Sequence, residues 1–226
     1  MNKSKAALIH LSLSILLIGL LLLIVLFIWY PKPFFDISGV IEPIKLLVLI
    51  DVIIGPLLTF VVYKQGKKSL KFDLSVIALL QLTALIYGAY ILHNGKPSLV
   101  VFDNGQFQYM VEKHSRYDNL VFKDLKPSLF SQPKMAHTKY DNIGIDIYEV
   151  FDSFEPLNNY VSMLEKYAIS VEDLKSQFES ESAQIDMLLT QYKGNQIVFF
   201  KLNHNQSFFY VAFSVDDMKI IDYLKI

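Results

Sequence analysis

Three long apolar runs dominate the first 93 residues, at positions 6–29, 46–63 and 74–93. Each is close to the roughly 20 apolar residues that a helix needs to cross the hydrocarbon core of a bilayer. The rest of the chain has no further run of that length and mixes charges, aromatic residues and turn residues. The pattern predicts a three-helix transmembrane domain, residues 1–93, followed by a folded exterior domain, residues 94–226.

The lysines near the ends of these runs predict an orientation. Six of them lie on the side that the N-terminus shares with the loop between the second and third runs: Lys3, Lys5, Lys64, Lys67, Lys68 and Lys71. The first loop holds only Lys32 and Lys45. Because loops rich in lysine stay in the cytoplasm, we expect a cytoplasmic N-terminus and an exterior domain on the opposite side of the membrane.

Composition narrows the function. From residue 95 onward the chain has 13 Lys and Arg against 18 Asp and Glu, so the exterior domain has no electrostatic reason to bind nucleic acid. The chain has no cysteine, which excludes disulfides and thiol catalysis. Its 5 histidines lack metal-ligand spacing, and no nucleophile elbow or phosphate-binding loop is present. The sequence therefore predicts neither an enzyme nor a metal or cofactor site.

The exterior domain shows alternating strand and helix patterns. Strands are predicted at 98–103 and 106–111, joined by Asn104-Gly105, the dipeptide best suited to a type I′ hairpin turn. Helical spacing then predicts helices at 157–164, 170–178 and 183–192. Three closing apolar runs predict an antiparallel meander: 196–202, 207–215 and 218–224. The predicted fold is α+β, with helices packed on a mostly antiparallel sheet.

Asp51 is the one carboxylate inside a predicted span. Placing it there costs about 3 kcal/mol on insertion scales, so it should face protein or water and is a candidate functional residue. The third span brings Tyr87 to a matching depth. A hydroxyl of Tyr87 bonded to Asp51 would make an internal clamp that needs no substrate, and both interpretations stay open at this point.

Three further residues in the spans predict helix packing. Gly55-Pro56 lies in the middle of the second span, where proline leaves a backbone carbonyl without its donor, that of Val52 in a regular α-helix. Gln81 places an amide in the middle of the third span, and such amides join helices more often than they bind ligands.

Several short motifs in the first 102 residues carry a family resemblance. They are Trp29-Tyr30-Pro31, Asp51 followed by Gly55-Pro56-Leu57-Leu58-Thr59, Asp73-Leu74-Ser75, Gln81, Tyr87-Gly88, and Pro97 with Val101-Phe102. In order and spacing they resemble the type IV pilin accessory protein family. The chain departs from that family's pattern in having Lys96 in place of Arg and a single Gly39 in place of a glycine pair.

The resemblance implies a multi-pass protein of the bacterial inner membrane with a periplasmic C-terminal domain. Its implied partners are a cognate type IV pilin, through the pilin's transmembrane helix and periplasmic head, the lipid bilayer, and in addition the pilus assembly machinery. A non-catalytic accessory factor or chaperone fits best. The alternative is a membrane-anchored sensor whose periplasmic domain binds a small ligand. A pilin-modifying transferase would need a polyprenyl-phosphate site and more spans.

Residues 112–144 have no sustained hydrophobic period and are the candidate surface for recognising the pilin head. Irregular segments with charged and aromatic side chains often carry partner contacts. The candidate contact residues are Lys113, Arg116, Tyr117, Lys123, Lys126 and Tyr140. A solvated loop without a partner is the alternative interpretation.

Overall fold

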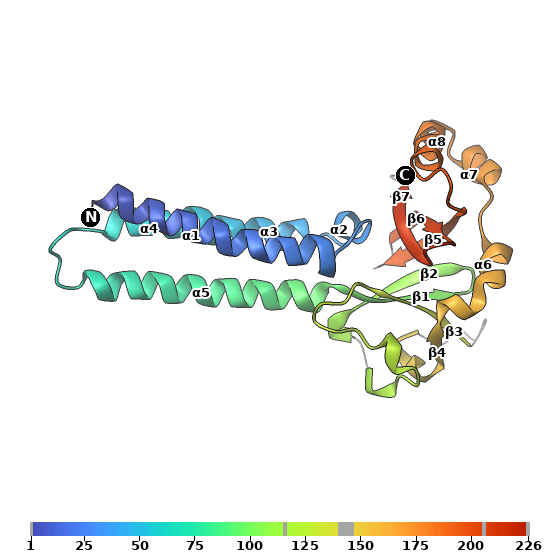
Figure 1. The fold of residues 1–226 in the computed structure, drawn as a ribbon, viewed down its shortest axis with the longest axis horizontal. Coiled ribbons are helices and arrows are strands. Elements are labelled where there is room, and N and C mark those ends of the chain that lie inside the picture. The colour runs from blue at the N-terminus through green and yellow to red at the C-terminus, as the bar shows by residue number, and fades with distance from the viewer. Residues whose placement is uncertain (1, 115–116, 140–146, 205–206, 225–226) are drawn as a thin grey trace. The chain divides into compact units, whose positions relative to one another are not determined.

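The computed structural model describes residues 2–114, 117–139, 147–204 and 207–224. The chain divides into two compact units. The helical unit comprises residues 1–31 and 35–96, and the sheet unit comprises residues 32–34 and 97–226. Each unit is described by itself below (Figure 1).

The helical unit is built from three long helices, two of which contain a π-helical segment. Its elements are α1 (Lys3–Ile24) with the π-helical segment Val25–Trp29, the short α2 (Phe34–Ile37) apart from its first residue, α3 (Ile41–Val48) with the π-helical segment Leu49–Ile54, α4 (Gly55–Val62) and α5 (Leu70–Gly95). The continuous helices Lys3–Trp29, Ile41–Val62 and Leu70–Gly95 are long and apolar enough to cross a membrane. The three predicted long helices are therefore confirmed.

The helices pack along their length: α1 lies against α4, and α5 lies against α3 and α4. At one end an aromatic group fixes the bundle. The hydroxyl of buried Tyr30 donates to the carbonyl oxygen of Leu92 at 2.8 Å, and the ring of Trp29 meets that of His93 edge-on, with centroids 5.2 Å apart. Sequence reasoning found the long helices but not these contacts, because periodicity does not say which side chain meets which.

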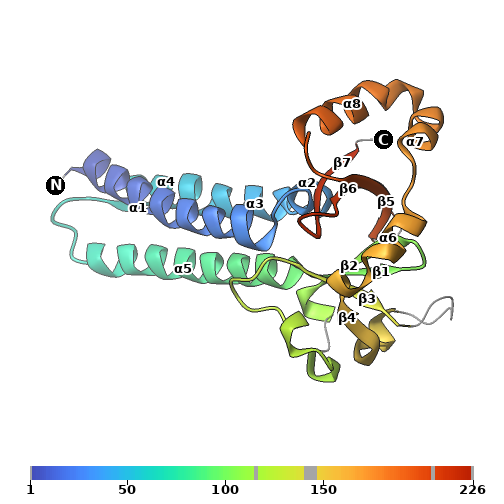
Figure 2. The ribbon, with the colours of Figure 1, turned by 45° about the vertical axis from the view of Figure 1, so that its right-hand side comes forward.

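The sheet unit is organised around one seven-stranded sheet of order β4-β3-β1-β2-β5-β6-β7. Its strands are β1 (Pro97–Asp103), β2 (Gln106–Val111), β3 (Lys134–Thr138), β4 (Phe154–Pro156), β5 (Ile197–His204), β6 (Ser207–Ser214) and β7 (Lys219–Leu224). Its α-helices are α6 (Val161–Tyr167), α7 (Val171–Gln177) and α8 (Ser182–Gln191). Figure 2 shows α7 and α8 beside the end of the sheet that β5, β6 and β7 form.

Several local predictions for this unit are confirmed. β1 and β2 form the predicted hairpin, and both turn residues, Asn104 and Gly105, have positive φ (49° and 78°) as a type I′ turn requires. β5, β6 and β7 form the predicted antiparallel meander. The helix predicted at 170–178 is α7, and the side chain of Ser170 caps it by accepting from the backbone N–H of Asp173 at 3.0 Å.

The prediction of a mostly antiparallel sheet is wrong, because the sheet is mixed. β1 pairs with β3 in parallel, and β2 pairs with β5 in parallel. Parallel neighbours need long crossovers. The chain supplies them in the segment between β2 and β3, which sequence analysis left unassigned, and in the helices α6 to α8, which precede β5. Strand pairing across such distances leaves no local pattern in the sequence.

Alternate residues of the strands fill two faces of the sheet. On one face Phe102, Phe107, Phe200 and Phe213 meet, with centroids of adjoining rings 5.1 to 6.1 Å apart. On the other face two apolar clusters form. One joins β1, β2 and β3 to the 3₁₀-helical segments near Leu125 and Phe151, and the other joins β5, β6 and β7 to α7 and α8. The unit thus has buried apolar side chains on both faces.

Candidate functional site

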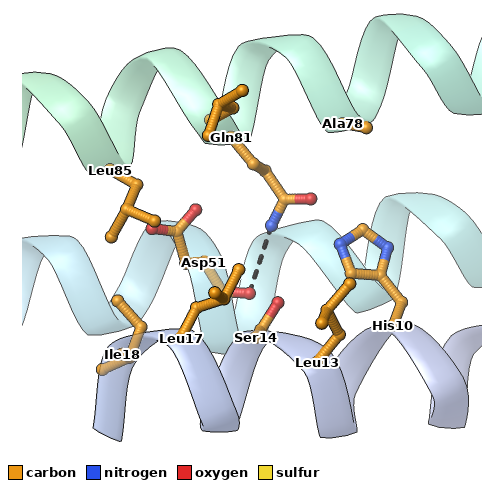
Figure 3. Close-up of a pocket in the computed structure, with 10 residues that line it drawn as sticks. His10, Leu13, Ser14, Leu17, Ile18, Asp51, Ala78, Gln81 and Leu85 are labelled. Carbon is orange, nitrogen blue, oxygen red and sulfur yellow. Dashed lines mark hydrogen bonds between the residues drawn. The ribbon is translucent and has the colours of Figure 1, made fainter. Parts of the chain in front are cut away.

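The helical unit contains a cavity of about 190 Å³ bounded by its three long helices. Six apolar and four polar side chains line it: His10, Leu13, Ser14, Leu17, Ile18, Asp51, Ala78, Gln81, Leu82 and Leu85. Figure 3 shows that the polar side chains come from all three helices: His10 and Ser14 from α1, Asp51 from the π-helical segment and Gln81 from α5. Two of the predicted packing residues, Asp51 and Gln81, therefore share one site.

Asp51 lies deep in this site, with 4% of its surface exposed. Neither of its carboxylate oxygens has a hydrogen-bond partner among the residues that the structure describes. An acidic group buried among apolar side chains without a partner is costly, and such groups are rare away from functional sites.

The predicted clamp between Asp51 and Tyr87 is wrong. Tyr87 is 64% exposed on α5, and it does not supply a hydrogen bond to either carboxylate oxygen of Asp51. Depth along two helices matched these residues, but the rotation of α5 turns Tyr87 outward and Gln81 inward. Depth alone therefore could not pair the side chains.

Gln81 does join two helices, as predicted, and the reason lies in the π-helical turn. The N–H of Gly55 donates to the carbonyl of Ile50, five residues earlier. In the same register the carbonyl of Asp51 would take its hydrogen bond from residue 56, which is proline and has no N–H. The side chain of Gln81 supplies the missing donor, because its Nε2 lies 3.1 Å from the carbonyl oxygen of Asp51. In this register the carbonyl that Pro56 deprives of a donor is that of Asp51, one residue before the expected Val52.

Gly55 makes this contact possible. A Cβ atom built on Gly55 would lie 1.8 Å from Nε2 of Gln81, so any larger residue would displace the amide. A second close approach occurs at Gly88, where a Cβ atom would lie 2.0 Å from Cδ1 of Leu47. Small residues let helices approach closely, and they are enriched where helices pack together in membranes.

Sequence reasoning missed a second polar contact in the bundle. Nδ1 of His10 lies 2.5 Å from Oγ1 of Thr59, and Thr59 is 3% exposed. A spacing of four residues carries the sequence signal: Asp51, Gly55 and Thr59 fall on one face of the second helix, as His10 and Ser14 do on the first. A stripe of polar and small residues on an otherwise apolar helix was therefore visible in the sequence.

The candidate contact residues of the sheet unit lie in a different environment. Lys113, Lys123 and Lys126 are exposed, and Lys126 lies 3.8 Å from Asp118. Tyr117 is partly buried and its hydroxyl donates to Glu112 at 2.8 Å. Arg116 and Tyr140 lie outside the described residues. Buried Leu120 and Leu125 anchor the described part of this segment to the apolar cluster on the sheet.

The described parts of the chain contain no group of three His, Asp or Glu side chains placed to hold a metal ion. In the cavity, Asp51 and His10 are the two titratable lining residues. The arrangement can therefore accept hydrogen bonds from a group that enters the bundle, and its lining is otherwise apolar.

Comparison with known proteins relates the sequence to one protein family. Residues 1–39 match the family model described as Fimbrial assembly protein FimB. Over 102 residues, 44% of this chain, the sequence is 39% identical to the fimbrial assembly protein of serogroups C1 and C2 of Dichelobacter nodosus, 78% of which is covered. It is also 39% identical over 102 residues to the serogroup I protein of the same bacterium, 40% of which is covered. No solved structure matches.

An apolar three-helix bundle followed by a sheet unit suits a membrane protein. The chain belongs to the fimbrial assembly protein family, which confirms the resemblance drawn from the sequence motifs. The matched segment spans 40% of the length of the serogroup I and serogroup E1 relatives.

Proposed function

We propose that this protein is a non-catalytic accessory factor of the bacterial inner membrane that binds a type IV pilin and promotes its stability and assembly into pili. The observation that carries the proposal is the match to relatives named fimbrial assembly proteins. The architecture supports it, because a pilin has an apolar helix and a globular head. A bundle with exposed apolar side chains and a folded sheet unit offer one surface for each part of such a partner.

In the proposed arrangement the helical unit spans the membrane, with its N-terminus in the cytoplasm and the sheet unit in the periplasm. The lysine distribution supports this orientation. Because the chain has no cysteine, single cysteines test it without background. We expect exposed Ser69→Cys to be shielded from an impermeant thiol reagent in intact cells and exposed Ser180→Cys to be labelled. Labelling of Ser69→Cys before lysis would reverse the orientation.

The bundle is proposed to hold the pilin helix, and the segment with Lys113, Tyr117, Lys123 and Lys126 is proposed to contact the pilin head. In support, the three lysines are exposed on a segment that two buried leucines fix to the sheet. Exposed charged and aromatic side chains on an anchored segment suit a partner surface.

Site-specific photocrosslinking in cells tests the proposal. A photoreactive residue replaces Leu57, 58% exposed on α4, or Lys123 in the sheet unit. Lys193, exposed after α8, is the matched control. We expect crosslinks to the cognate pilin from the first two positions and none from the control. If all three variants are present at normal levels and none traps the pilin, direct binding is wrong.

A further inference from the structure

The cavity beside Asp51 contains more hydrogen-bond acceptors than the surrounding side chains have donors for. Three buried acceptor atoms near it have no donor among the described residues: both carboxylate oxygens of Asp51 and Oε1 of Gln81. Figure 3 shows the carboxylate among Leu17, Ile18 and Leu85, with the amide oxygen of Gln81 turned toward the side of His10. None of the ten lining residues is Lys or Arg. The site therefore offers acceptors, and one negative charge when Asp51 is ionised, to a group that brings donors.

The size of the cavity limits what can enter. Its 190 Å³ is below the roughly 300–1,000 Å³ typical of small-molecule sites, so it suits one side chain better than a complete metabolite. The lining residues Leu13, Leu17 and Leu82 are 54%, 42% and 52% exposed. The entering group thus crosses apolar surface, which a group carried by an apolar helix does more readily than a dissolved polar molecule.

The charge of the Asp51 carboxylate indicates which chemical group the cavity would bind. A carboxylate in an apolar setting is stabilised by an opposite charge, and an ammonium group has three donors and no acceptor to leave unpaired. His10 is the only other titratable lining residue, and its Nδ1 is already engaged with Thr59. We propose that the cavity beside Asp51 binds the ammonium group of a basic residue on an apolar helix of a partner protein.

This inference rests on the proposed membrane insertion of the helical unit and adds the chemistry of the partner's side chain. It does not require that the partner be a pilin. Binding of an ammonium group would also leave Gln81 free to keep its hydrogen bond to the backbone of Asp51, because that bond uses Nε2 and the carbonyl oxygen. The structural hydrogen bond and the proposed binding site thus use different atoms of Asp51 and Gln81.

The test uses the full chain in phosphatidylcholine liposomes and synthetic Leu/Ala helices of about 20 residues. The peptides differ at one central position, which is Lys, Gln or norleucine. Energy transfer from a dye on Ser69→Cys reports binding. We expect the Lys peptide to bind about tenfold more tightly than the norleucine peptide, the factor that one good interhelical polar contact supplies. The Gln peptide should bind less tightly than the Lys peptide.

Matched variants assign the preference to Asp51. Asp51→Asn keeps the shape without the charge and should remove the preference for Lys, whereas Asp51→Glu should keep it. Tyr87→Phe changes an exposed polar residue outside the cavity and should leave it unchanged. Circular dichroism identifies variants that do not fold. If Asp51→Asn is one of them, the preference for Lys is tested in Asp51→Glu, which keeps the charge.

Three results would overturn the inference: equal binding of the Lys and norleucine peptides, equal binding of the Lys and Gln peptides, or an unchanged preference in Asp51→Asn. Competition by phosphatidylethanolamine would assign the site to a lipid amine instead. The outcome is separable from the proposed function. Pilin crosslinks without a Lys preference would remove this inference alone, and a Lys preference without pilin crosslinks would remove only the pilin as partner.

Discussion

The two units of this protein distribute polar and apolar side chains in opposite ways. In the helical unit many large apolar side chains are exposed, Leu79 and Leu80 among them, while Asp51 and Thr59 are buried. In the sheet unit the buried residues are chiefly apolar, with Phe107 and Phe200 fully covered. The sheet unit is therefore arranged for water on its outside, and the helical unit for an apolar surrounding.

The difference changes what holds each unit together. Burial of apolar surface drives the folding of a unit in water. Between helices in lipid that force is weak, so close packing and polar contacts take its place. Gly55, Gly88 and the bond from Gln81 to Asp51 are contacts of this second kind. Truncations of apolar side chains should therefore have unequal effects in the two units.

The largest effect is expected from removing an aromatic ring in the sheet unit. Phe200→Ala deletes a buried ring whose centroid lies 5.2 to 5.3 Å from those of Phe102 and Phe107. Such a truncation lowers the free energy of unfolding by about 3–5 kcal/mol. Leu79→Ala in the helical unit, where Leu79 is 65% exposed, is the matched apolar truncation and should change stability by less than about 0.5 kcal/mol.

Urea unfolding of the full chain in detergent, monitored by the proteolysis of each unit, measures the free energy of unfolding of both variants. Similar losses for the two truncations would show that the exposed face of α5 is packed in the protein as purified. The comparison between an apolar interior and an apolar exterior would then fail.

A smaller effect is expected from adding one methyl group inside the bundle. Gly55→Ala places Cβ against Nε2 of Gln81 and separates that amide from the carbonyl of Asp51. A buried acceptor that loses its donor costs about 1–3 kcal/mol. Gly19→Ala on α1 is the matched control, because nothing lies within 4 Å of its Cβ position. It should be neutral or stabilise by up to about 1 kcal/mol.

Thermal unfolding of the helical unit, monitored by far-ultraviolet circular dichroism, distinguishes the Gly55→Ala and Gly19→Ala variants. If Gly55→Ala is as stable as Gly19→Ala, the amide of Gln81 has moved without loss, and its bond to Asp51 does not hold the helices together.

The local features of the fold were readable from the sequence. Apolar run length predicted the three long helices, Asn104-Gly105 predicted the hairpin, and helical spacing predicted the helix at 170–178 that the structure shows as α7. Each depends on neighbours within a few residues. The parallel pairings of β1 with β3 and of β2 with β5 join strands separated by long segments, and no period in the sequence records them.

The candidate site was predictable in part for the same reason. The cost of a carboxylate in an apolar run identified Asp51, and Pro56 indicated a backbone carbonyl without its usual donor. The sequence did not give the rotation of α5, which brings Gln81 rather than Tyr87 to the site. It also did not give the π-helical register, which moves the free carbonyl from Val52 to Asp51. Both depend on how helices pack, which is a property of several segments at once.

The smallest effect is expected at the surface of the sheet unit, where ion pairs and hydrogen bonds are exposed to solvent. Nζ of Lys139 lies 2.5 Å from Glu155, and the hydroxyl of Tyr160 donates to the same carboxylate. The ion pair with Lys139, followed by the bond from Tyr160, holds the pKa of Glu155 below its ordinary value of 4.5. The pair therefore stabilises the fold above pH 4.5, and this contribution is lost as the pH falls through the lowered pKa.

Lys139→Ala should raise the pKa of Glu155 toward its ordinary value and leave stability at pH 7 almost unchanged, because exposed ion pairs contribute little. Carbon-13 NMR titration of labelled glutamate carboxyl groups in the full chain measures the shift. Lys193→Ala, which removes an exposed lysine elsewhere on the unit, should leave the titration of Glu155 where it was. A large loss of stability at pH 7 in Lys139→Ala would mean that this surface pair supports the sheet unit as Gln81 supports the bundle, and the contrast between the units would not extend to their polar contacts.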